Sequence, residues 1–124
     1  MNKLFLQSGA ILGLLGVAIG AFGAHAFAKM LEASGRTATF ETAVKYQFYH
    51  ALVLILIGLL FKEIPTKFMT YSGYCMLIGV LIFSGSLYTI CFTGIKAFGA
   101  VAPIGGTLMI AGWGLLIYAV SRMT

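Results

Sequence analysis

Charged residues are scarce in this sequence, and their scarcity excludes an ordinary soluble protein. Only 9% of the 124 residues are charged and only three residues are acidic, whereas 60% are hydrophobic and the mean hydropathy is +1.02. A soluble domain carries about 25% charged residues. The composition therefore predicts an integral membrane protein.

Motifs of catalysis and cofactor binding are missing as well. The sequence has no glycine-rich phosphate loop, no catalytic carboxylate pair and no nucleophile motif, so we do not expect an enzyme. Its cysteines, Cys75 and Cys91, lie about 24 Å apart along one predicted helix, too far for a disulfide. The histidines lack metal-ligand spacing, so we expect no metal and no cofactor. The basic residues stand singly, which argues against nucleic-acid binding.

Long uncharged runs are abundant. A helix needs about 20 apolar residues to cross the hydrocarbon core of a bilayer, and four runs reach or approach that length. The first run ends in a small-x-small pattern that resembles a signal cleavage site, but it is longer than a signal core, so we treat it as a span. We expect one transmembrane domain, residues 1–124. The predicted spans are about 4–28, 46–62, 68–93 and 98–121.

The connections between these spans predict their arrangement. Residues 62–67 and 93–99 form short links, as expected between antiparallel neighbours. The longer first link predicts a surface helix at about 37–45, which continues into the second span and is separated from the first by Gly35. The expected fold class is all-α: a polytopic membrane protein with four transmembrane helices in an antiparallel bundle and a short surface helix between the first and second.

Four spans place both termini on one side of the membrane. The basic residues divide equally, four to each side, so the positive-inside rule does not decide the orientation. The free amino terminus favours the cell (cytoplasmic) membrane with both termini in the cytoplasm. A dual orientation, or one set by partner proteins, is the alternative.

Glycine recurs along the first span at spacings of four and three residues, which places the glycines on one helix face. Because lipid tails offer no hydrophobic drive between helices, such faces permit close backbone approach. Close packing within one bundle explains the row, and a subunit contact in a homo-oligomer is the sharper interpretation. The predicted packing glycines are Gly9, Gly13, Gly16, Gly20, Gly23, Gly105, Gly106 and Gly112.

Polar side chains gather on the side of the membrane away from the termini. Each has a structural interpretation: a neutral histidine bonds a neighbouring carbonyl, a serine bonds the preceding turn, and a tyrosine joins an aromatic belt. The functional interpretation is a polar vestibule. A metal site would use both histidines with Glu41 or Cys91. The predicted cluster comprises His25, Glu41, Gln47, His50, Ser84, Ser86 and Tyr88.

Five short segments carry a family resemblance. They are GAFGAHAF (20–27), YQFYHAL (46–52), FSGSLY (83–88), APIGG (102–106) and AGW (111–113). In this combination the chain resembles the YwdK/YgdD-like family of small four-helix membrane proteins, a domain of unknown function. The family pattern often has glycine where this chain has Ala26 and threonine where it has Ala102. The resemblance implies the fold and a membrane location, suggests a role in membrane integrity, and supplies no reaction.

Two functional hypotheses follow. The preferred one is a non-catalytic integral membrane protein that acts in membrane organisation or integrity, or as an accessory to a partner membrane protein. The alternative is a small transporter, channel or ion-binding protein with a polar vestibule around His25 and His50. The lipid bilayer surrounds the protein in both hypotheses.

Overall fold

The computed structural model describes residues 2–64 and 66–123, and this part of the chain contains helices and no strands. A π-helical turn, η1 (Ile19–Gly23), interrupts the first long helix, and a 3-10 turn, η2 (Lys96–Gly99), precedes the last. The α-helices are α1 (Lys3–Ala18), α2 (Ala24–Ala26), α3 (Ala28–Ser34), α4 (Thr37–Leu60), α5 (Lys67–Thr93) and α6 (Ala102–Ser121).

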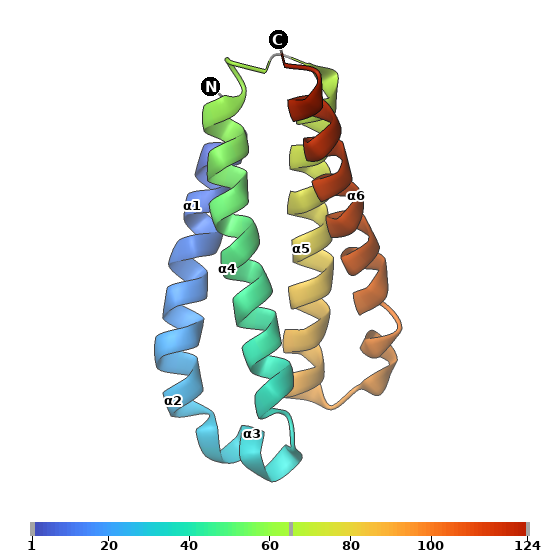
Figure 1. The fold of residues 1–124 in the computed structure, drawn as a ribbon. Coiled ribbons are helices and arrows are strands. Elements are labelled where there is room, and N and C mark those ends of the chain that lie inside the picture. Colours follow the sequence, from blue (N-terminus) through green and yellow to red (C-terminus); the bar gives the residue numbers. More distant parts are fainter. Residues whose placement is uncertain (1, 65, 124) are drawn as a thin grey trace.

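Four helical stretches are long and apolar enough to cross a membrane. They are Lys3–Ala26, Thr37–Leu60, Lys67–Thr93 and Lys96–Ser121. Successive stretches run in opposite directions, and both termini lie at the same end (Figure 1). The expected all-α fold of a polytopic membrane protein is confirmed.

The region between the first two spans agrees with the expectation in one respect and differs in another. The helix predicted at 37–45 forms the first turns of α4 and continues into the second span, as expected, whereas the short helix α3 before Gly35 was not predicted. α3 ends at Gly35, whose φ of 69° is the left-handed conformation that favours glycine at a helix C-terminus. Leu31 of α3 is buried with Phe40 and Cys91, so α3 folds back against the bundle.

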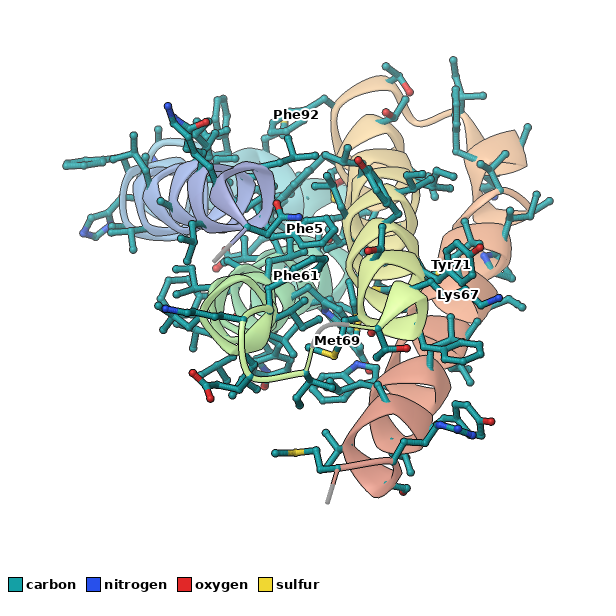
Figure 2. The ribbon with its side chains drawn as sticks, turned by 90° about the horizontal axis from the view of Figure 1, so that it is seen from above. Phe5, Phe61, Lys67, Met69, Tyr71 and Phe92 are labelled. Atoms are coloured by element: carbon teal, nitrogen blue, oxygen red, sulfur yellow. The ribbon has the colours of Figure 1, made fainter. Side chains whose placement is uncertain are left out.

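The helices pack in chain order: α1 on α4, α4 on α5, and α5 on α6. Seen from above, α4 and α5 stand between α1 and α6 (Figure 2). The arrangement leaves one groove between α1 and α5 and another between α4 and α6.

The apolar core extends to the end that carries the termini. Phe5 is fully buried, and its ring packs against the rings of Phe61 and Tyr74. It fills the space beside Gly73, where a Cβ would collide with the ring. Figure 2 shows Phe5 pointing in among α1, α4 and α5. At this end the ring therefore fills the space between α1 and α5.

Candidate functional site

The glycine row of the first span faces α4. A Cβ on Gly9 would lie 2.7 Å from the carbonyl oxygen of Ala51, and one on Gly20 would lie 3.1 Å from Val44. The row is therefore covered within the chain, and a subunit contact would need a different surface. The other members, whose nearest neighbours also belong to α4, are Gly13, Gly16 and Gly23.

Glycines also bring α5 and α6 together. A Cβ on Gly105 would lie 2.5 Å from the carbonyl oxygen of Gly79 and from the backbone nitrogen of Phe83. One on Gly112 would lie 3.0 Å from the side chain of Met76. Gly106 is less crowded, since its nearest neighbour would be 3.8 Å away.

Gln47 is the centre of a polar network that joins three helices. Its amide nitrogen donates to the carbonyl of Leu12 in α1 at 2.9 Å, and its amide oxygen accepts from the hydroxyl of Tyr88 in α5 at 2.6 Å. The hydroxyl of Ser84 donates to the carbonyl of Ala43 in α4 at 2.8 Å. Gln47, Ser84 and Tyr88 thus lie together beside the groove between α1 and α5.

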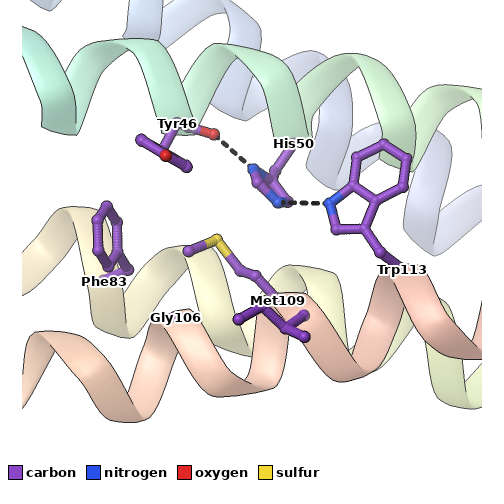
Figure 3. A pocket seen from close by; sticks show the side chains of 7 residues that line it. Tyr46, His50, Phe83, Gly106, Met109 and Trp113 are labelled. Carbon is purple, nitrogen blue, oxygen red and sulfur yellow. Dashed lines mark hydrogen bonds between the residues drawn. The ribbon is translucent and has the colours of Figure 1, made fainter.

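His50 lies on a different side of α4. Its Nδ1 is 2.8 Å from the carbonyl oxygen of Tyr46, and its Nε2 is 3.2 Å from the indole nitrogen of Trp113 in α6 (Figure 3). A carbonyl only accepts and an indole nitrogen only donates, so both bonds form together only in the neutral Nδ1–H tautomer. A metal or a proton at Nε2 would have to displace Trp113. Trp113 belongs to the AGW segment that carries the family resemblance, but it was not predicted as a member of the polar cluster.

The other predicted polar residues belong neither to the network around Gln47 nor to the pair formed by His50 and Trp113. Ser86 donates to the carbonyl of Ile82 in its own helix at 2.6 Å. His25 is exposed on α2, and Glu41 is exposed on α4 at the rim of a separate groove. The seven side chains therefore occupy several places, although each lies within or beside the spans. Among residues 2–64 and 66–123, no three His, Cys, Asp or Glu side chains are placed to hold a metal ion.

The groove between α4 and α6 has a volume of about 230 Å³, and the one between α1 and α5 about 220 Å³. Rings of Tyr46, Phe83 and Trp113 line the first (Figure 3). Both grooves are partly open and are lined mainly by apolar side chains. Their geometry suits lipid chains or bulky side chains rather than a solvated solute.

The sequence of this chain matches a known protein family. Residues 19–106 match the family described as "Protein of unknown function (DUF423)". The chain belongs to the DUF423 family. The matched region includes Gln47, His50, Ser84 and Tyr88 and ends before Trp113.

The alignments with related proteins cover almost the whole chain. A UPF0382 membrane protein of Staphylococcus haemolyticus is 43% identical and is covered, like this chain, over 93% of its length. The UPF0382 membrane protein YwdK of Bacillus subtilis is 36% identical, with 94% of this chain and 95% of YwdK covered. The UPF0382 inner membrane protein YgdD of Escherichia coli is 30% identical, with 98% and 92% covered. No solved structure matches the chain.

These relatives confirm the resemblance that the five segments indicated. The names describe membrane proteins, and the four apolar helices agree with them. The chain is therefore a DUF423 membrane protein.

Proposed function

We propose that this DUF423 protein is a non-catalytic protein of the cell membrane, with both termini in the cytoplasm. It acts in membrane organisation and integrity, or as an accessory to a partner membrane protein. The observation that carries this proposal is that polar side chains within the spans join one helix to another.

Each pair of neighbouring helices has such a bond. Gln47 joins α4 to α1, and Ser84 joins α5 to α4. Ser72 donates to the carbonyl of Gly112 at 2.6 Å and so joins α5 to α6. In the described part of the chain, every buried side-chain nitrogen or oxygen atom has a hydrogen-bond partner. A solute pathway needs polar groups that can exchange their partners for the solute, which favours a structural use of these groups.

The outer surface of the spans carries large exposed apolar side chains. Leu14, Phe22 and Ile110 are 70%, 76% and 74% exposed, and they project from the first and last spans. Apolar side chains on a spanning helix face lipid or another membrane protein. We therefore assign the protein's action to lateral contacts within the bilayer, and we expect a homo-oligomer or a membrane protein partner to use them.

Flux through reconstituted protein tests this function against the transporter alternative. Liposomes with the purified protein and a pH-sensitive dye should show the same proton leak as protein-free liposomes. A leak that increases with protein content and disappears in Gln47→Leu and His50→Leu, but persists in the exposed control Leu14→Ala, would overturn the proposal.

Loss of the gene in its native host tests the role in membrane integrity. Uptake of a membrane-impermeant dye should increase, and expression of wild type or His25→Ala should reverse it. Unchanged dye uptake together with unchanged detergent sensitivity would contradict the role.

A further inference from the structure

A third groove, of about 450 Å³, lies between the end of the first span and the beginning of α4. We call it the α2–α4 groove. One wall comes from η1 and α2, and the other comes from α4. The lining residues are Gly20, Ala24, Phe40, Glu41, Val44 and Lys45.

Small residues open this groove. The first span meets α4 closely at Gly20, where a Cβ would lie 3.1 Å from Val44. One turn further, Ala24 presents only a methyl group, so Phe40 and Val44 line the groove as an apolar floor. The widened π-helical turn η1 lies in this wall, and such turns are common at functional sites.

The charges at the rim are one acid and one base. Glu41 and Lys45 are four residues apart on α4, so they lie on the same helix face, and both are exposed. The α2–α4 groove therefore combines an apolar floor with a carboxylate and an ammonium group.

The groove lies at the depth of the lipid headgroups. About 20 helical residues cross the hydrocarbon core, which is about 30 Å thick. Lys62 and Lys3 mark the membrane surface at the end that carries the termini. About 20 residues back from Lys62, α4 reaches the opposite surface beside Glu41. About 20 residues forward from Lys3, the first span reaches that surface beside Ala24. Lys45 is one turn deeper, and its flexible stem can carry the ammonium group to the headgroups.

A phospholipid with a primary-amine headgroup matches these charges. Its ammonium group can donate hydrogen bonds to the Glu41 carboxylate while its phosphate pairs with Lys45. A choline headgroup has no N–H to donate. A glycerol headgroup has hydroxyl donors but no cation to pair with the Glu41 carboxylate.

We propose that the α2–α4 groove binds a phospholipid with a primary-amine headgroup, with Glu41 on the ammonium, Lys45 on the phosphate and the first acyl carbons beside Val44. Such binding goes beyond the proposed function, and it is measurable whatever the flux and integrity experiments yield.

Native mass spectrometry of the delipidated full chain tests the site. The probes are phosphatidylethanolamine, phosphatidylcholine and phosphatidylglycerol with identical acyl chains. Phosphatidylethanolamine should bind about two- to fivefold more tightly than phosphatidylcholine, the range for exposed charge pairs. Glu41→Gln should remove this preference, whereas Lys45→Gln should weaken the binding of all three lipids.

Matched variants separate the groove from general surface charge. Glu32→Gln and Lys29→Gln change exposed charges outside the groove lining and should leave the preference intact. Ala24→Trp should fill the groove and abolish the preference, whereas Ala26→Trp, also exposed and two residues away, should not. Circular dichroism establishes that each variant is folded.

Three results would overturn the proposal. They are equal binding of the three lipids, tighter binding of phosphatidylglycerol, and a preference for phosphatidylethanolamine that survives Glu41→Gln in a folded variant. Soluble phosphoethanolamine at the lipid's concentration should not displace the lipid, because it lacks the acyl chains. Displacement would be a fourth contrary result, because it would contradict the assignment to a phospholipid.

Discussion

The contact between α5 and α6 and the one between α4 and α6 are built by opposite means. α5 and α6 meet backbone to backbone where Gly79 and Gly105 face each other. α4 and α6 are separated by a groove, which the hydrogen bond between His50 and Trp113 crosses. One contact has no spare volume, and the other has a cavity beside it.

The difference shows that the helix contacts in one membrane bundle can differ in how they are stabilised. Lipid tails are as apolar as leucine, so helix association depends on close packing and hydrogen bonds. Backbone atoms in a glycine contact cannot move aside without separating the helices, whereas side chains across a groove can adopt other rotamers. We therefore expect substitutions to cost most at the glycine contacts and least across the groove.

The largest effect is expected for Gly105→Ala. The new Cβ would lie 2.5 Å from backbone atoms of Gly79 and Phe83, so α5 and α6 must move apart. We expect a loss of about 1–3 kcal/mol in the free energy of unfolding, the usual range for overpacking. Thermal unfolding in detergent, followed by circular dichroism, measures it. Gly114→Ala is the matched control, because its Cβ would meet nothing within 4 Å. Equal losses in both variants would refute the explanation.

Within the glycine row of α1, Gly9→Ala should destabilise the protein and Gly13→Ala should not. A Cβ on Gly9 would lie 2.7 Å from the Ala51 carbonyl oxygen and 2.8 Å from the Ile55 side chain, whereas one on Gly13 would lie 3.9 Å from its nearest neighbour. Because Ile55 can partly adjust, we expect a loss of about 1–2 kcal/mol at Gly9, in the lower part of the overpacking range. Unfolding by increasing SDS fraction compares the two variants. A greater loss in Gly13→Ala would contradict the close approach of Gly9 to Ala51.

The polar network should give an intermediate effect. Gln47→Leu removes the bonds to Leu12 and Tyr88 and leaves the tyrosine hydroxyl without this partner. Hydrogen bonds between membrane helices contribute about 0.6 kcal/mol on average and at most about 1.7, so we expect a loss in this range. The same SDS unfolding measures it.

A double-mutant cycle with Tyr88→Phe isolates the side-chain pair. The double variant should lose less stability than the two single variants together, because both singles remove the same bond. Strict additivity would mean that Gln47 and Tyr88 do not interact.

Four helices long enough to span a membrane follow from the sequence, whereas the neighbours of the polar side chains do not, for a physical reason. Charge spacing gives the depth of a residue along its helix, but it does not identify the neighbour that its side chain meets. Gln47 and His50 are three residues apart, about 60° around the axis, and this angle directs them to different helices. The partner of His50, Trp113, is 63 residues away in the chain. Local pattern does not contain such a pairing.

The glycine row shows the same limit. A spacing of four and three predicts a shared face, but the crossing of α1 and α4 decides that Gly9 is crowded and Gly13 is not. The continuation of the helix at 37–45 into the second span, by contrast, was predictable, because no glycine or proline lies between Thr37 and Ile57 to end it.

The smallest measurable effect is expected for Trp113→Phe. Phenylalanine keeps an aromatic wall for the groove but loses the 3.2 Å bond to His50 Nε2. The free energy of unfolding should fall by about 0.6 kcal/mol, less than in Gly105→Ala.

Fluorescence tests the same bond between Trp113 and His50 by changing His50 and observing Trp113. Trp113 is the only tryptophan, so the tryptophan emission of the protein reports on the surroundings of this one indole ring. His50→Leu removes the acceptor, and the emission maximum should shift to shorter wavelength, as for an indole that has lost a hydrogen bond in an apolar groove. Leu52→Ala, on the same helix but outside the groove, should leave the emission unchanged. If the two variants shift the emission equally, the shift does not come from loss of the bond between Trp113 and His50.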